Sequence, residues 1–246
     1  AEPDVDFTAA DGIGHTLWVV SSPDQVAALR AAFGAIEATY VADGHHRSAS
    51  AFRVRDNLRA RNPQHTGEEA YNHFLAVAFP DDELKIMGYH RVVQDLHGLD
   101  PAAFLDRVRE RFTVETTADP EPPQARVFTM HLAGQWYRLT AKEGTFPPDH
   151  PVKSLDAAIL QDNLRAAVLG IDDPRTSGRI DFVGGIRGTG ELERRCQRDM
   201  AVAFALHPVS VEQLMAIADA GEIMPPKSTW FEPKLRSGVV VRTLED

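Results

Sequence analysis

The segment DGHHR, residues 43–47, places two histidines and an arginine directly after an Asp-Gly pair. A turn here, followed by a helix, would aim the free backbone N–H groups of the helix start at an anion. Gly44 permits a tight turn and the close approach of a ligand. Cationic side chains oppose the helix dipole at that end, and a bound phosphate would remove the conflict. The alternative is a solvated turn in which Arg47 pairs with Asp43 or Asp56.

Each residue of this motif has a role in the phosphate hypothesis. Gly44, His46 and Arg47 are the candidate phosphate-binding residues. Asp43, His45 and His46 are the candidate catalytic residues. Asp43 is the only carboxylate in the motif, and a carboxylate commonly accepts the proton of a reacting hydroxyl. Capping the helix would occupy that carboxylate, so the base could also lie elsewhere.

A second unusual segment is the loop MPPKSTWFEPK, residues 224–234, which contains three prolines. A stiff loop that carries polar side chains beside aromatic ones suits ligand recognition. Lys227 is the candidate second phosphate contact, and Ser228, Thr229 and Trp230 are candidate substrate-binding residues. The alternative is that the aromatic side chains fill the core and the polar ones form turn hydrogen bonds.

The segment IDFVGGIRGTGELERR, residues 180–195, reads as strand, glycine turn and helix. Its glycines do not fit the G-x-G-x-x-G spacing of a dinucleotide site. Glu191 and Glu193 at the helix start disfavour a bound anion there, so a tight turn before a capped helix is the simpler interpretation. Arg187 is a candidate substrate-binding residue that could share a cleft with Asp181.

Bulk properties limit the classes of function. Hydrophobic residues make up 43% and charged residues 25% of the 246 residues, as in ordinary globular proteins. No apolar run approaches the roughly 18 residues that a membrane span needs. The net charge of −10 disfavours nucleic-acid binding. The single cysteine, Cys196, excludes an internal disulfide, favours a cytoplasmic setting and is expected to be a buried apolar residue. The histidines show no metal-binding spacing, so no metal site is predicted.

The pattern of predicted strands and helices that must position these residues indicates an α+β fold with a mixed sheet. Predicted strands cover residues 15–20, 36–42, 73–80, 84–93, 125–132, 135–141, 179–183, 201–206 and 237–244. Predicted helices cover residues 22–36, 45–61, 100–112, 154–170, 191–200 and 211–221. Hairpins are expected between 73–80 and 84–93 and between 125–132 and 135–141. The segment TTADPEPPQ, residues 116–124, is the best candidate for a linker. It would divide the chain into two lobes, 1–116 and 125–246. The alternative is that both lobes form one domain.

ADGHHR followed by an alanine-rich helix resembles the phosphate-binding motif of the ParB/sulfiredoxin superfamily. That superfamily includes CTP-dependent ParB proteins, ATP-using sulfiredoxins and free-serine kinases. A closer similarity is to a bacterial and archaeal family of unknown function related to it. The similar segments cover nearly the whole chain: YVADGHHRSASA, YNHFLAVAFP, IDFVGGIRGTGELERR and MPPKSTWFEPKLRSG. The resemblance implies that the chain corresponds to the C-terminal part of longer proteins, so that a general base could lie upstream.

One departure from the superfamily narrows the expected chemistry. Sulfiredoxin-type motifs carry a cysteine where this chain has His45, so repair of a sulfinic acid is disfavoured. The resemblance then implies a kinase-like phosphotransferase acting on a small hydroxyl metabolite, with serine as the best candidate. Its donor would be a nucleotide or another polyphosphate, with Mg²⁺ bound through the donor phosphates. A nucleotide-binding regulatory module without catalysis and a ParB-like DNA-associated protein are the alternatives. Nothing in the residues indicates an oligomeric state.

Overall fold

The computed structural model describes residues 1–243, and the chain divides into two compact units, Ala1–Val41 and Ala42–Asp246. The first unit contains an antiparallel pair of strands, β1 (Val5–Thr8) and β2 (Gly14–Leu17), and the helix α1 (Pro23–Gly34). No side chain of this unit is buried. The strand predicted over 36–42 is wrong, because alternation of apolar residues makes a strand only where a neighbouring strand supplies hydrogen bonds.

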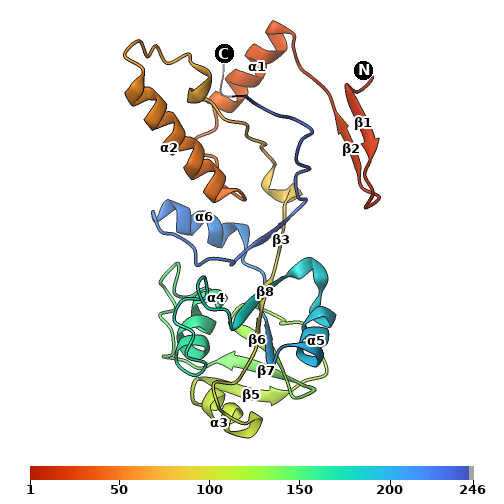
Figure 1. Ribbon diagram of the computed structural model, residues 1–246, viewed down its shortest axis with the longest axis vertical. Helices are drawn as coiled ribbons and strands as arrows, with labels where there is room; N and C mark the ends of the chain where they lie inside the picture. Colours follow the sequence, from red (N-terminus) through yellow and green to blue (C-terminus); the bar gives the residue numbers. More distant parts are fainter. Residues whose placement is uncertain (244–246) are drawn as a thin grey trace. The chain divides into compact units, whose positions relative to one another are not determined.

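The second unit contains a six-stranded sheet (Figure 1). Its strand order is β5-β7-β6-β9-β4-β8. The bounds are β4 (Tyr89–Val93), β5 (Phe112–Thr116), β6 (Val127–Leu132), β7 (Gln135–Ala141), β8 (Ile180–Gly184) and β9 (Val202–Ala205). The α+β class is confirmed. The expectation of a mixed sheet is wrong, since every strand pairing found in residues 1–243 is antiparallel.

The helices of the second unit follow the sequence prediction closely. They are α2 (His45–Arg61), α3 (Pro101–Arg111), α4 (Asp156–Leu160), α5 (Thr189–Arg198) and α6 (Val211–Asp219), with a π-helical turn, η3 (Gln161–Ala166), that continues α4. Short 3-10 turns are η1 (Ala70–Asn72), η2 (Asp81–Glu83) and η4 (Gly185–Arg187). Asp100, the first residue of the helix predicted over 100–112, caps α3, because its carboxylate accepts the N–H of Ala103 at 2.9 Å. None of the helices in residues 1–243 combines the length and apolar character that a membrane span requires.

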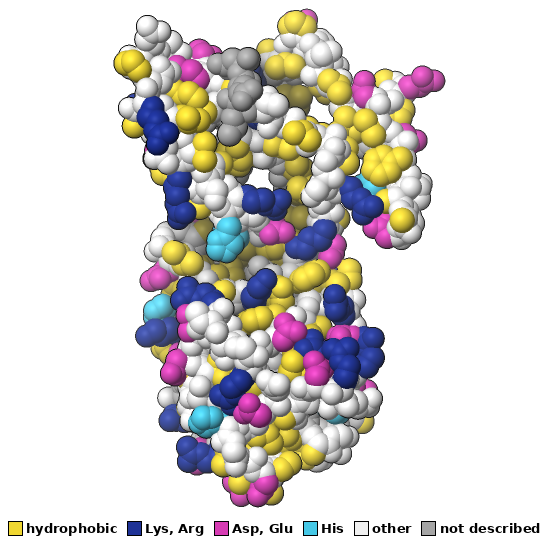
Figure 2. All heavy atoms as spheres, in the orientation of Figure 1, with side chains coloured by type: hydrophobic (Ala, Val, Ile, Leu, Met, Phe, Trp, Pro, Cys, Tyr) yellow, Lys and Arg dark blue, Asp and Glu magenta, His cyan; other side chains and the backbone are white. Residues whose placement is uncertain are grey.

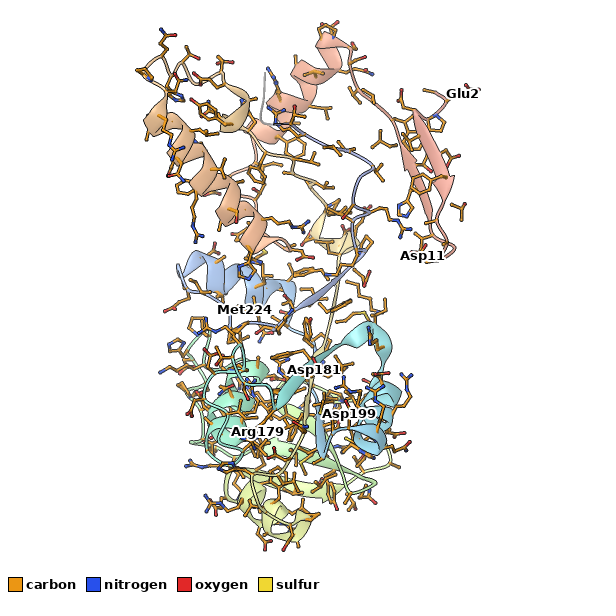
Figure 3. The ribbon with its side chains drawn as sticks, viewed as in Figure 1. Glu2, Asp11, Arg179, Asp181, Asp199 and Met224 are labelled. Carbon is orange, nitrogen blue, oxygen red and sulfur yellow. The ribbon has the colours of Figure 1, made fainter. Side chains whose placement is uncertain are left out.

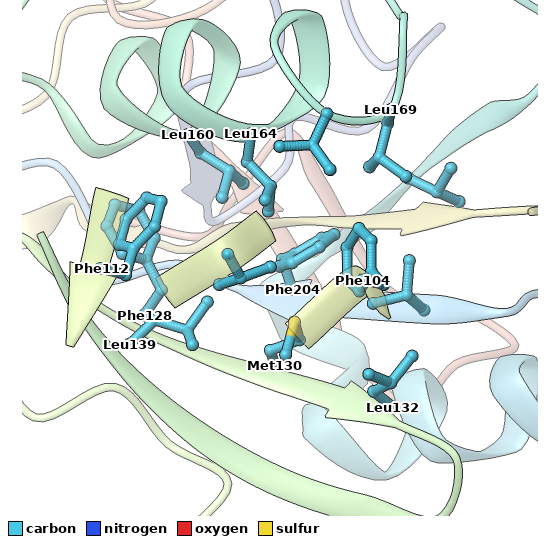
Figure 4. Close-up of a cluster of buried hydrophobic side chains, with 14 of the residues drawn as sticks. Phe104, Phe112, Phe128, Met130, Leu132, Leu139, Leu160, Leu164, Leu169 and Phe204 are labelled. Atoms are coloured by element: carbon cyan, nitrogen blue, oxygen red, sulfur yellow. The ribbon is translucent and has the colours of Figure 1, made fainter. Parts of the chain in front are cut away.

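The core lies on both faces of the sheet because successive strand residues point to opposite sides. Val93 of β4 belongs to the larger cluster and its neighbour Val92 to the smaller one. The larger cluster is built on Phe128, Met130 and Phe204 and is shown in Figure 4. Helices α3 and α4 with η3 add side chains to that cluster, and α5 adds Leu192, Cys196 and neighbouring residues to the smaller one.

Three strand predictions in the second unit need correction. Residues 73–80 form no strand, and with exposed side chains they have no sheet neighbour to pair with. The predicted strand over 84–93 divides at Gly88 into β3 (Lys85–Met87) and β4, and β3 pairs instead with β10 (Trp230–Glu232). Residues 237–243 form no strand, and Leu244, the last residue of that prediction, lies outside the described residues.

The loop at 116–124 connects β5 with the next strand of the same sheet, β6. The hairpin predicted beyond it is confirmed: β6 and β7 pair in register around Ala133 and Gly134. Both turn residues have positive φ, 50° and 81°, as a two-residue hairpin turn requires. Strands from both predicted lobes, 1–116 and 125–246, therefore share one sheet.

Asp156, the first residue of α4, is a buried acid. Burial raises the pKa of Asp156 from 3.8 to about 7, against the hydrogen bonds that it accepts from the backbone N–H groups of Arg126 and His207. One carboxylate oxygen, Oδ1, is 2.8 Å from the Arg126 nitrogen, and the other is buried without a partner in the described structure. The folded state therefore holds the proton of Asp156 more tightly than the unfolded chain does.

We expect Asp156→Asn to stabilise the protein increasingly as the pH rises. Because the folded-state pKa is raised, the free energy of unfolding of the wild type falls between about pH 4 and pH 7. The asparagine carries no such penalty, so its advantage should grow to as much as about 4 kcal/mol at pH 8, since one pKa unit corresponds to about 1.4 kcal/mol. Urea unfolding of both proteins at pH 4 and pH 8 measures this. An equal difference at both pH values would contradict the prediction.

Candidate functional site

The α2 start has the geometry that the DGHHR motif predicted. Gly44 has a left-handed backbone with φ 87°, and α2 begins at the next residue, His45. No side chain caps the helix start, and the Asp43 carboxylate instead accepts the N–H of Gly44 at 2.7 Å. The helix predicted over residues 45–61 is confirmed. The first N–H groups of a 17-residue helix are therefore left to water or a ligand.

The cationic side chains of the motif lie in the first turn of α2, and His45, His46 and Arg47 are all exposed. The Arg47 guanidinium folds back against Gly44, with Nη2 3.1 Å from the position that a Cβ on Gly44 would occupy. Within residues 1–243, no salt bridge joins Arg47 to Asp43 or to Asp56. The structure thus places a guanidinium beside the uncapped helix start without the ion pair that the solvated-turn alternative requires.

Asp43 pairs with Lys234, a residue that the sequence analysis missed. The Lys234 Nζ lies 2.9 Å from the Asp43 carboxylate, across 191 positions of sequence. Burial raises the pKa of Asp43. The hydrogen bonds from Lys234 and from the Gly44 N–H, together with the nearby charges of Lys234 and Arg47, outweigh burial and hold the pKa below its usual range. The ion pair brings the proline-rich loop to the DGHHR motif. The sequence indicated a role for Lys234 only in that this residue ends the same loop that contains Lys227.

Two lysines of this loop flank a pair of aromatic rings, one from the loop and one from β4. Lys234 Nζ lies 4.9 Å from the centre of the Trp230 ring, which meets the Tyr89 ring edge-on at 5.5 Å. Lys227 Nζ lies 5.5 Å from the centre of the Tyr89 ring. Lys227 has a left-handed backbone, φ 60°, which is a costly conformation for a non-glycine residue. We use the term cation-aromatic shelf for Tyr89, Lys227, Trp230 and Lys234.

The glycine turn of the third motif positions this shelf. A Cβ on Gly184 would lie 2.4 Å from Cε3 of Trp230, and one on Gly185 would lie 2.6 Å from the carbonyl oxygen of Gly88. The glycines therefore allow the indole to pack directly on the end of β8. This packing supports the interpretation of the segment as a tight turn. It also explains the glycine at residue 184, because a side chain there would clash with the Trp230 indole.

The other predicted substrate residues have different surroundings. Arg187 is exposed, whereas Asp181 pairs with Arg195, whose Nη1 is 2.8 Å from the carboxylate. Arg195 also contacts Asp199. Asp181 and Asp199 are labelled in Figure 3. Figure 2 shows basic and acidic side chains intermixed over this part of α5. Within residues 1–243, no hydrogen bond or salt bridge joins Arg187 to Asp181, which pairs with Arg195 instead.

The polar residues of the loop are only partly available to a ligand. The Ser228 hydroxyl is buried and donates to the carbonyl oxygen of Pro225 at 2.7 Å, as the turn alternative expects. Phe231 is buried as part of β10, while Thr229 and Trp230 are half-buried. Within residues 1–243, no group of three or more His, Cys, Asp or Glu side chains converges as a metal site.

The fold and site together define an α+β protein in which an antiparallel sheet carries a cation-aromatic shelf beside an uncapped helix start. The chain belongs to the family described as protein of unknown function (DUF1015), whose model matches residues 1–158. This confirms the resemblance to a family of unknown function. No curated protein matches the chain.

Several solved structures are similar to the chain at low identity. A free serine kinase in complex with AMP has 12% identity and a TM-score of 0.46, over 87% of this chain and 81% of that chain. A conserved hypothetical protein from Pyrococcus furiosus has 12% identity and a TM-score of 0.45, over 87% of this chain and 84% of that chain. SbnI with a C-terminal truncation, from Staphylococcus aureus, has 17% identity and a TM-score of 0.36, over 67% of this chain and 55% of that chain.

Proposed function

We propose that this protein binds the phosphate groups of a nucleotide or polyphosphate at the α2 start and transfers phosphate to a small hydroxyl metabolite such as serine. The observation that carries the proposal is the uncapped start of α2 at Gly44, with the Arg47 guanidinium beside it and not paired with an acid. Backbone N–H groups and a guanidinium are the donors that phosphate prefers. Serine and the donor class come from the sequence resemblance.

Catalysis of this kind depends on positioning and on neutralising charge. The backbone N–H groups and Arg47 would hold the donor phosphates, with Gly44 leaving room for their approach. Lys227 of the cation-aromatic shelf, which forms no salt bridge within residues 1–243, would neutralise a second phosphate. Mg²⁺ would arrive bound to the donor and reduce the charge on its phosphates.

A proton acceptor for the reacting hydroxyl must come from the same turn or from another part of the protein. The ion pair with Lys234 keeps Asp43 ionised and lowers its basicity. We therefore assign to Asp43 the positioning of Lys234, and to His45 or His46 the acceptance of the proton. The occupied carboxylate also favours the second candidate function, a regulatory module that binds nucleotide without turnover.

Transfer is tested by incubating the protein with ATP, Mg²⁺ and L-serine and following phosphoserine by ³¹P NMR. We expect phosphoserine to form, and Lys227→Met to slow its formation because a charge that faces the donor is lost. Lys153→Met, which removes an exposed lysine distant in sequence from every motif, is the control. ATP binding without phosphoserine would indicate the regulatory module, and failure to bind ATP, ADP or pyrophosphate would contradict both functions.

A further inference from the structure

A cavity of about 300 Å³ lies between α5 and the hairpin of β6 and β7. His131, Trp136, Glu193, Cys196 and Met200 line it, together with the turn residues of the hairpin. No residue of the DGHHR motif or of the cation-aromatic shelf is part of its wall. The cavity is therefore separate from the site of the proposed phosphate chemistry.

Glu193 places a negative charge in the cavity wall that no cation of the described chain compensates. Its Oε1 accepts the indole N–H of Trp136 at 2.6 Å, and no salt bridge to Glu193 forms within residues 1–243. The neighbouring arginines of α5 are engaged with other acids: Arg194 with Glu191, and Arg195 with Asp181 and Asp199. A half-buried carboxylate without a cation favours a positively charged ligand.

His131 adds a nearly buried imidazole to the same wall. Its side chain is 5% exposed, and its Nδ1 is buried without a hydrogen-bond partner in the described structure. The imidazole packs against Trp136 with ring centres 5.0 Å apart. Burial lowers the pKa of His131, although Glu193 acts in the opposite direction.

We propose that this cavity binds a small primary ammonium ligand with an aliphatic body. The ammonium group donates to the Glu193 carboxylate, and the aliphatic part packs against Trp136 and Met200. The indole face adds a favourable contact for a cation. A volume of 300 Å³ is at the lower end of ligand pockets, which restricts the ligand to a small molecule.

The proposal is tested with n-butylammonium as the probe and n-butanol as its uncharged counterpart. We expect n-butylammonium to bind with a dissociation constant of about 1 mM and n-butanol to bind at least about tenfold more weakly, since one charged hydrogen bond is lost. In ¹H–¹⁵N spectra, the indole signal of Trp136 should shift on addition of the amine, because that N–H donates to Glu193. This measurement uses the unmodified chain.

Glu193→Gln is the matched test of the charge. The new amide oxygen can still accept the Trp136 indole N–H, so we expect the fold to persist and the affinity for n-butylammonium to fall roughly tenfold or more. Glu143→Gln, at an exposed turn after β7, should leave that affinity unchanged. Equal binding of amine and alcohol, or unchanged affinity in Glu193→Gln, would overturn the proposal. An unshifted Trp136 signal would overturn it as well.

Discussion

Arg47→Ala is expected to weaken the binding of ATP or ADP roughly ten- to a hundredfold, because a hydrogen bond to a charged group contributes about 1.5–3 kcal/mol. The same change should leave the unliganded protein as stable as the wild type or slightly more stable. Arg47 places a positive charge at the positive end of the α2 dipole and forms no salt bridge within residues 1–243. Calorimetric titration with ADP and thermal melting without ligand measure the two effects.

Arg53→Ala is the matched control for this prediction, because it removes an exposed arginine from the same helix two turns away from the motif. It should change neither the affinity nor the melting temperature appreciably. If Arg47→Ala instead destabilises the protein and leaves ADP affinity unchanged, the basic turn is a structural feature and the phosphate hypothesis for Arg47 is wrong.

Gly184→Ala should both destabilise the protein and weaken phosphate binding. The added Cβ would lie 2.4 Å from Cε3 of Trp230, and the indole cannot withdraw freely because Tyr89 and Lys234 contact it. Overpacking of this kind typically costs about 1–3 kcal/mol. Moving Trp230 would also displace Lys234 from Asp43, so the change at β8 should reach the α2 start. Urea unfolding and ADP titration measure the two consequences.

Gly190→Ala is a control in the same segment, and we expect it to change the stability of the protein in the opposite direction. A Cβ at that position meets no atom within 4 Å, and the residue lies inside α5. Alanine in a helix is favoured over glycine by roughly 0.5–1 kcal/mol, so this variant should be slightly stabilised and should bind ADP normally. Normal stability and ADP affinity in Gly184→Ala would show that the Trp230 packing does not position the site.

The sequence predicted correctly those elements whose ends are determined by adjacent residues. The helix predicted over 100–112 and the hairpin predicted between 125–132 and 135–141 are confirmed. Asp100 caps the helix and Ala133-Gly134 forms the turn, and caps and turns are set by a few adjacent residues. The strands predicted over 36–42 and 73–80 failed since a strand depends on partners that are distant in sequence. Neither range forms a strand, although both have alternating or continuous apolar character.

The parts of the candidate site that adjacent residues form could be predicted from the sequence. The contacts between residues distant in sequence could not. The motif itself predicted the left-handed Gly44 and the helix that follows it. The Asp43–Lys234 ion pair joins residues 191 positions apart, and the contact of Gly184 with Trp230 joins two separate motifs. The periodicity and spacing of residues in the sequence do not predict such contacts, because the contacts form only when the sheet and its loops have assembled.

The central claim is that the α2 start binds phosphate, and the backbone amides of that turn report on it directly. Titration of the ¹⁵N-labelled protein with ADP, followed by ¹H–¹⁵N spectra, tests the claim without any substitution. We predict that the largest and saturable shifts occur at the amides of Gly44, His45, His46 and Arg47, where phosphate oxygens would accept the N–H groups. Saturable ADP binding that leaves these four amides unshifted, or no binding at all, would contradict the claim.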